Sequence, residues 1–137
     1  VYAESVPQND AAGFVDDSVA VELKMSDGSI ASILYAASGD KAVSKEKIDI
    51  FCDKAVATID DFRSGEFVRG KRIKLGGGAQ DKGHAAEVSA FVAAARGQSP
   101  SPFNLESLAA TTLTTFGINE SVRTGKAVAI DAGRILG

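Results

Sequence analysis

Two hydrophobic periods follow one another along this chain, a period of two in the first half and a period near 3.6 in the second. From Ser18 to Met25 apolar residues alternate with polar or small ones, which predicts a strand with one buried face. Asp27 and Gly28 separate this run from a second one at residues 30–36. Asp-Gly between two such runs predicts a hairpin, because the turn needs a positive φ that glycine adopts without strain.

Five further runs are typical of strands: Val1–Val6, Lys47–Phe51, Ala55–Ile59, Glu66–Arg69 and Arg72–Leu75. The last four are joined by connections much shorter than the roughly twelve residues that a parallel crossover needs. We therefore expect a mainly antiparallel β-sheet of about six strands. The strand at residues 30–36 has apolar residues on both faces, which predicts a central or doubly covered position.

The helical pattern begins at Lys82 and extends to Arg96. We expect Asp81 to cap this helix and Gly97 to end it. A second helix should start at Asn104, its expected N-cap. The expected buried stripe of this second helix consists of Leu105, Leu108, Ala109, Leu113 and Phe116.

A sheet followed by two helices, each with one apolar face, indicates the α+β class. We expect both C-terminal helices to pack on one face of the sheet and the other face to stay partly open. Arg123 lies in the last turn of the second helix, and Gly125 closes it.

The composition narrows the possible functions. A length of 137 residues, with 45% of them apolar, fits a single domain at 1–137. Fifteen Lys and Arg against eighteen Asp and Glu give a net charge of −3 without a basic block, so we expect no nucleic-acid partner. No apolar run approaches the ~20 residues of a bilayer span, so we expect no membrane partner. The single cysteine, Cys52, indicates a reduced, metal-free and cytoplasmic protein.

The stretch Gln80–Glu87 is the first place to look for a site, because it joins the strand region to the first helix and contains the only histidine, His84. A helix N-terminus favours anions and polar ligands. Gly76–Gly78 precedes it but does not complete G-x-G-x-x-G, because position 81 is Asp. The stretch therefore predicts no dinucleotide binding. A flexible turn and an ordinary surface or capping histidine are the alternatives at this point.

Other candidate groups are weaker. Asp60 and Asp61 are adjacent, so on a strand they point to opposite faces, and we expect a strand-end turn instead of a catalytic pair. Cys52 has no nearby His or second Cys, which favours a structural thiol. No serine lies in G-x-S-x-G.

Longer stretches carry a family resemblance. Asp16–Ser29 resembles D-D-x-V-x-V-x-L-x-F-x-D-G-S, the entry to the C-terminal sheet of the Gfo/Idh/MocA oxidoreductases, the family of glucose-fructose oxidoreductase and inositol dehydrogenase. Gln80–Val88, continuing to Gly97–Pro102, resembles the penultimate helix of that family and its G-x-x-P ending. Ser107–Thr112 together with Glu120–Val128 is similar to its closing helix and final short strand.

The resemblance implies the C-terminal domain of a longer enzyme. The family begins with a Rossmann domain that carries a glycine fingerprint, an E-K-P lysine and a D-x-x-x-H pair. None of these occurs here, and Val1 corresponds to a point beyond them. The resemblance thus implies that NAD or NADP binds an N-terminal Rossmann domain of the same parent chain. The present residues would bind no cofactor and no metal and would include no catalytic residue.

The implied role is substrate binding and oligomerisation in an NAD(P)-dependent dehydrogenase that acts on a sugar-like or polyol substrate. His84 lies three residues before Glu87, where relatives often place a Tyr or His that lines the substrate pocket, and Lys82 is its neighbour. The loop with Lys41 and Lys45 resembles the family loop near the same cleft. We expect these four residues to bind the small-molecule substrate, and the open sheet face to form a homo-oligomer.

Two other functions are considered. The first is a stand-alone α+β interaction module that dimerises through the open sheet face and has no enzymatic activity. The second is an independent hydrolase that uses His84, which is disfavoured because the sequence offers no nucleophile motif.

Overall fold

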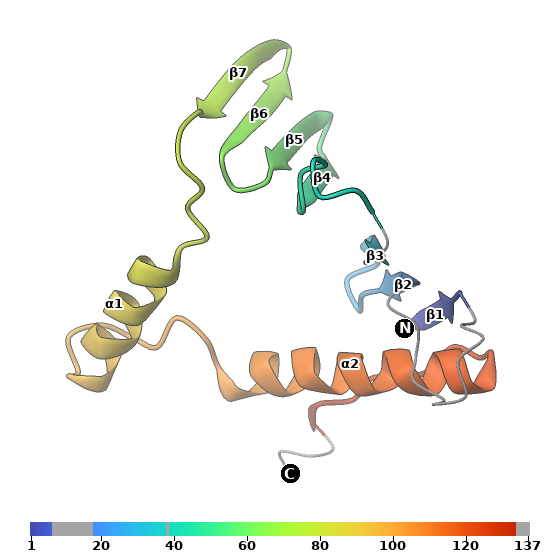
Figure 1. The fold of residues 1–137 in the computed structure, drawn as a ribbon. Helices are drawn as coiled ribbons and strands as arrows, with labels where there is room; N and C mark the ends of the chain where they lie inside the picture. Colours follow the sequence, from blue (N-terminus) through green and yellow to red (C-terminus); the bar gives the residue numbers. More distant parts are fainter. Residues whose placement is uncertain (7–17, 38, 134–137) are drawn as a thin grey trace. The chain divides into compact units, whose positions relative to one another are not determined.

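The computed structural model describes residues 1–6, 18–37 and 39–133, and the chain divides into two compact units (Figure 1). The first unit consists of Val1–Gly39 and Phe103–Gly137, and the second of Asp40–Pro102. The first contains strands β1 (Tyr2–Ser5), β2 (Ser18–Lys24) and β3 (Ile30–Ala36) and helix α2 (Leu105–Thr124). The second contains strands β4 (Lys47–Cys52), β5 (Ala55–Asp60), β6 (Ser64–Arg69) and β7 (Lys71–Gly76) and helix α1 (His84–Ala95). Asp16 and Asp17, which open the family-like motif, lie outside the described residues.

The predicted α+β class with antiparallel sheet is confirmed. The described strands number seven rather than about six, and they form two sheets, ordered β1-β2-β3 and β4-β5-β6-β7. All paired strands within each sheet are antiparallel. The break between the two sheets falls between β3 and β4, which are not paired with each other.

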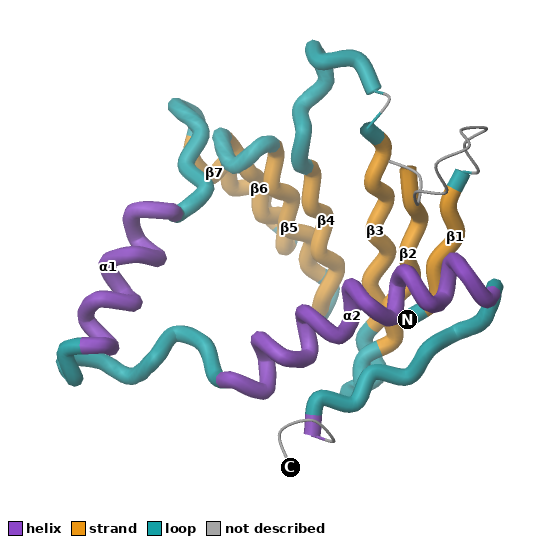
Figure 2. The backbone as a smooth tube through the Cα atoms, turned by 60° about the horizontal axis from the view of Figure 1, so that its bottom comes forward, coloured by secondary structure: helices purple, strands orange, loops and turns teal. Residues whose placement is uncertain are grey.

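In the first unit, α2 packs against β1. Figures 1 and 2 both show the C-terminal half of this helix beside the three-stranded sheet. The core is small and centres on Ala3, Val21 and Ser121. Gly117 is also buried. A Cβ at this position would lie 2.6 Å from Ile130 Cδ1 and 2.9 Å from Val1 Cγ1, so these side chains pack closely against the helix. The helix can approach the rest of the unit this closely only because these positions are small.

The expected buried stripe of α2 is not buried within its unit. Leu105, Leu108 and Phe116 are each more than half exposed. Helical periodicity identified an apolar face, but the contact with β1 is made by the face that carries Gly117 and Ser121. The predicted ends of α2 are confirmed: the Asn104 side chain accepts a hydrogen bond from the Ser107 N–H at 2.7 Å, and Gly125 follows at φ 65°.

The face of the three-stranded sheet that carries Ile30 and Leu34 is open within its unit, with these side chains 77% and 81% exposed. The other face of β3 carries Ile33, which pairs with the buried Val21 of β2 and lies on the same face of the sheet. The predicted β2–β3 hairpin is confirmed. Its turn has Gly28 at φ 90°, with the Gly28 N–H donating to the Met25 carbonyl at 3.1 Å.

The four-stranded sheet of the second unit is a meander with two different faces. The register aligns Ile48, Ile59, Gly65 and Leu75 in one row across the strands, and Ile50, Ala57, Phe67 and Ile73 in another. The opposite face contains the row Asp49, Thr58, Glu66 and Lys74, in which Thr58 donates to Asp49 at 2.8 Å. The same face also contains the row Phe51, Val56, Val68 and Arg72, so it is mixed in character, whereas the first face is mainly apolar.

Helix α1 starts later than the sequence predicts. Its N-cap is Gly83 at φ 79°, and Asp81 instead accepts a hydrogen bond from the Gly83 N–H at 2.8 Å. Asp81 stabilises the turn before the helix, so its short side chain cannot also cap the first helical turn. The expected end is confirmed by Gly97 at φ 70°. None of the α1 residues is buried, so packing of α1 on a sheet is not seen within its unit.

Residues 126–131, which were expected to include a short closing strand, do not form a strand. The backbone nitrogen and oxygen of Val128 nevertheless each form a hydrogen bond of 2.8 Å with Val1. Neither described helix is both long and apolar enough to cross a membrane.

Candidate functional site

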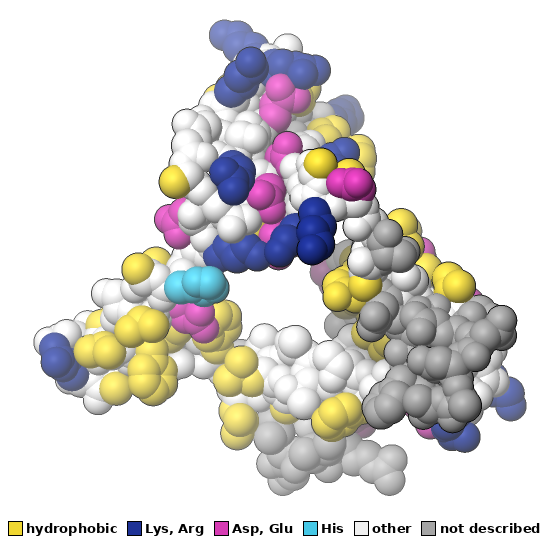
Figure 3. All heavy atoms as spheres, in the orientation of Figure 1, with side chains coloured by type: hydrophobic (Ala, Val, Ile, Leu, Met, Phe, Trp, Pro, Cys, Tyr) yellow, Lys and Arg dark blue, Asp and Glu magenta, His cyan; other side chains and the backbone are white. Residues whose placement is uncertain are grey.

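Three of the four predicted substrate residues line one hollow in the second unit. This hollow has a volume of about 470 Å³, and its lining includes Lys41, Lys45 and Lys82. Arg63 adds a fourth cation, and Asp61 is the only carboxylate among the lining residues. We call this feature the basic hollow. Figure 3 shows Lys and Arg side chains at the top of the part of the chain that holds β4–β7 and also along its lower margin.

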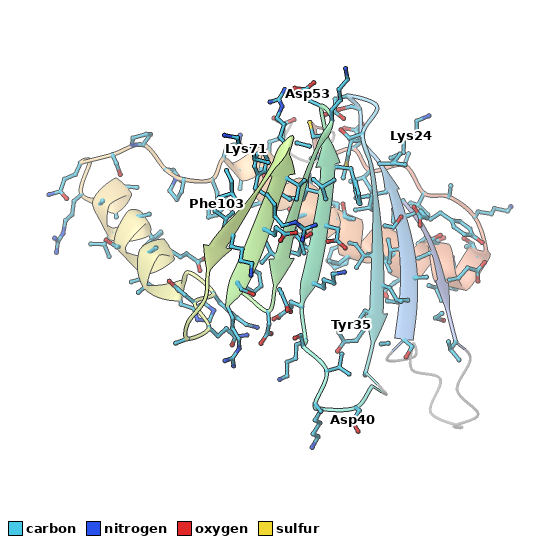
Figure 4. All side chains as sticks on the ribbon, turned by 90° about the horizontal axis from the view of Figure 1, so that it is seen from above. Lys24, Tyr35, Asp40, Asp53, Lys71 and Phe103 are labelled. Carbon is cyan, nitrogen blue, oxygen red and sulfur yellow. The ribbon has the colours of Figure 1, made fainter. Side chains whose placement is uncertain are left out.

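The basic hollow is formed by three segments that are separated in sequence. The first is the loop before β4, the second is the turn between β5 and β6, and the third is the connection from β7 to α1. Figure 4 shows Asp40 at the end of the sheet opposite to Asp53 and Lys71. The basic hollow therefore lies at the end of the sheet away from the β4–β5 and β6–β7 turns.

Asp61 connects all three segments. Its backbone N–H donates to the Glu46 carbonyl at 2.7 Å, which fixes the loop before β4. The Gln80 side-chain amide donates to both the backbone carbonyl and the carboxylate of Asp61, each at 2.9 Å. Arg63 Nε donates to the other carboxylate oxygen at 2.9 Å. The backbone and side chain of one residue thus hold groups from each wall of the basic hollow in position.

Backbone and charged contacts reinforce this arrangement. The Asp81 N–H donates to the Phe62 carbonyl at 3.0 Å, and the Gly77 N–H donates to the Arg63 carbonyl at 2.9 Å. Lys82 Nζ lies 2.6 Å from Glu46 Oε1 and 6.0 Å from the centre of the Phe62 ring. Lys82 is therefore held by a carboxylate and an aromatic face.

The turn that carries Asp61 is strained. Asp61 and Phe62 have φ values of 51° and 52°, in the left-handed region that non-glycine residues rarely adopt. Aspartate tolerates this region better than phenylalanine, because a short polar side chain can bond to nearby backbone. Such strain costs about 1–3 kcal/mol per residue and concentrates at ligand-binding and switch regions. Arg63, the residue that follows this pair, is among the residues that line the basic hollow.

The Asp61 carboxylate is stabilised in its charged form. The hydrogen bond from Arg63 lowers its pKa below the usual value of 3.8, with further lowering from the charge of Arg63, the backbone N–H of Lys45 and the charge of Lys82. Partial desolvation acts in the opposite direction but is outweighed. At neutral pH, Asp61 is therefore an ionised acceptor that orients cations and has no proton to donate.

His84, the fourth predicted substrate residue, begins α1 and is exposed, and it is not among the residues that line the basic hollow. Arg63, Asp61 and Gln80 were not predicted as ligand-binding residues. Asp61 was expected in a strand-end turn, which is where it lies. Its hydrogen bond with Gln80, 19 residues away, has no local sequence signal, because it forms only when the segment after β7 lies beside the turn between β5 and β6.

Other chemistry is sparse in the described part of the chain. No group of three His, Cys, Asp or Glu residues there is placed to hold a metal ion. Cys52 is a free, exposed thiol at the end of β4. A second hollow, of about 490 Å³ in the first unit, is lined mainly by apolar residues such as Leu113 and Phe116 and offers no cationic side chain.

Comparison of this sequence with models of protein families finds no match, and comparison with curated proteins finds no similar sequence. The basic hollow and the fold are therefore the observations from which a function is inferred.

Proposed function

We propose that this chain is the substrate-binding and oligomerisation domain of an NAD(P)-dependent dehydrogenase that acts on a sugar-like or polyol substrate. The observation that carries the proposal is the meeting of Lys41, Lys45 and Lys82 in one hollow. These lysines belong to two separate stretches of the chain, and each stretch independently resembles a substrate-cleft segment of the Gfo/Idh/MocA oxidoreductases. In this proposal, NAD or NADP and the hydride chemistry belong to an N-terminal Rossmann domain of the parent chain.

The chemistry of the basic hollow fits a role in positioning a substrate. Ammonium, guanidinium and amide N–H groups are donors, and they suit the oxygen atoms of a polyhydroxylated molecule. Asp61 supplies an acceptor for a substrate hydroxyl, but its low pKa makes it a poor proton donor. Such groups raise the rate by orienting the substrate for hydride transfer, and the cofactor supplies the hydride. His84, two residues beyond Lys82, extends this set of substrate residues in the proposal.

An exposed apolar surface supports the oligomerisation role. Ile50, Ile73 and Leu75 are each 51% exposed and lie on the same face of the four-stranded sheet. Contiguous exposed apolar residues mark interaction surfaces in many proteins. The same observation favours the second candidate function, a stand-alone module that dimerises and has no enzymatic activity.

Calorimetry with NAD and NADP, on the 137-residue chain and on its parent chain side by side, tests the proposal. We expect the parent to bind one of the two nicotinamide cofactors and the 137-residue chain to bind neither. In the parent, His84→Ala should raise KM for the substrate with kcat little changed, because a residue that only binds substrate acts on KM. An unaltered KM removes His84 from the site. Failure of the parent to bind either cofactor would favour the interaction module.

A further inference from the structure

The basic hollow has more positive charge than its own carboxylates neutralise. Asp61 is engaged by Arg63, and Glu46 by Lys82. Among the described residues, neither Lys41 nor Lys45 forms an ion pair with a carboxylate. Two ammonium groups therefore line the same hollow without a carboxylate of the described part of the chain to balance them. This excess stands out in a chain whose net charge is −3.

Arg63 supplies an oriented donor fork beside these lysines. Its Nε is held by Asp61 at 2.9 Å, and 57% of its side chain is exposed. Within the described residues its two terminal nitrogens have no protein acceptor. A guanidinium has five N–H donors, and those on its terminal nitrogens match the two oxygens of a carboxylate or phosphate. Because Asp61 already holds the Nε of Arg63, less side-chain freedom is lost when Arg63 binds an anion.

We propose that the basic hollow binds an anionic group, a phosphate or carboxylate, carried by a polyhydroxylated small molecule. The terminal nitrogens of Arg63 donate two hydrogen bonds to the anion, and Lys41 and Lys45, from the loop before β4, neutralise the charge of the anion. This inference rests on the proposed function in one respect, the polyhydroxylated body of the ligand. It goes further in assigning the charge of the substrate class and the residues that recognise it.

Titration of the ¹⁵N-labelled 137-residue chain, followed by NMR, tests the assignment. The probes are glucose 6-phosphate, gluconate, glucose and inorganic phosphate, at matched ionic strength. We expect glucose 6-phosphate or gluconate to shift the amide signals of residues 41–45 and 61–63, with at least tenfold lower dissociation constants than glucose. A response to glucose 6-phosphate alone assigns the anion as a phosphate, and a response to gluconate alone assigns it as a carboxylate. Inorganic phosphate should shift the same signals more weakly.

Matched variants separate a specific site from a general effect of charge. Lys41→Gln with Lys45→Gln should weaken binding of the anionic probe about tenfold or more. Lys54→Gln with Lys71→Gln removes the same charge at the opposite end of the sheet and should change it less than twofold. Arg63→Lys keeps the charge but loses the fork, and should also weaken binding. All five substituted positions are exposed, and the amide spectrum of each variant confirms that it folds.

Equal binding of glucose and glucose 6-phosphate in the basic hollow would overturn the anion assignment and leave the proposed substrate-binding role intact. Equal weakening by the two double variants would also overturn it, as would the absence of shifts at residues 41–45 and 61–63 with every probe. The cofactor calorimetry on the parent chain is independent of these results. An anion site in a parent that binds no nicotinamide cofactor would retain this inference and reject the dehydrogenase.

Discussion

Ser121→Ala should destabilise the first unit markedly more than Ser107→Ala, the same change at an exposed position of α2. Ser121 is fully buried, and its hydroxyl connects three parts of that unit. It accepts a hydrogen bond from the Ala3 N–H of β1 at 2.9 Å and donates one to the Lys126 carbonyl at 2.7 Å. Removal of a single oxygen atom leaves both backbone groups without this partner.

The expected loss can be estimated from these contacts. An unsatisfied buried N–H at Ala3 costs about 1–3 kcal/mol. The Lys126 carbonyl is only partly buried, so water can replace part of its bond, and we assign it about 0.5–1 kcal/mol. Alanine is favoured over serine in a helix by about 0.5 kcal/mol, which offsets a fraction of the loss. The net decrease in the free energy of unfolding is about 2 kcal/mol, which corresponds to a Tm lower by roughly 6–10 °C.

Urea unfolding followed by circular dichroism measures this difference. Ser107→Ala is the matched control, because Ser107 lies on the same helix and is exposed, so the variant gains the same helix propensity without losing a buried bond. We expect Ser107→Ala to remain within about 0.5 kcal/mol of the unchanged chain. A Ser121→Ala variant as stable as Ser107→Ala would refute the reasoning, since the hydroxyl would then contribute nothing to the packing of α2 on β1.

Three other predictions concern stability and titration. Gly65→Ala should lower the free energy of unfolding by about 1–3 kcal/mol in urea titration, because the added Cβ would lie 2.7 Å from a backbone carbonyl oxygen of β5. Gly78→Ala is the control, and it should not destabilise the chain, because the added Cβ would have no neighbour within 4 Å. Asn104→Ala should cost about 1 kcal/mol in the same assay by removing the N-cap of α2, and an unchanged midpoint would show that the cap is dispensable. The folded pKa of Asp61 lies below 3.8, so its stabilising contribution is present above that pH and is lost as the pH falls through the folded value. Arg63→Gln should raise this pKa toward 3.8 in a carboxyl NMR titration, and an unshifted titration would exclude the hydrogen bond from Arg63 as its main cause.

Local sequence signals located most elements and several of their ends. Alternation identified the strands, and Asp27 with Gly28 identified the first hairpin. Asn104 and Gly125 marked the ends of α2. These features depend on residues within a few positions of one another, so they can be read from spacing. The predicted N-cap of α1 was wrong. The Asp81 side chain could accept a hydrogen bond either from the first helical turn or from the turn before it, and it accepts one from the Gly83 N–H in the preceding turn.

The sequence by itself determined the α+β class, the antiparallel pairing and the two apolar periods. Only the tertiary structure decided which face of α2 meets β1, because Gly117 and Ser121 allow close approach where larger apolar residues do not. It also decided the composition of the basic hollow. Lys41, Lys45 and Lys82 were selected from the sequence, but the hydrogen bonds of Asp61 that bring them together with Arg63 span three separated segments. Contacts of that kind follow from strand register and turn geometry, which local residue spacing does not encode.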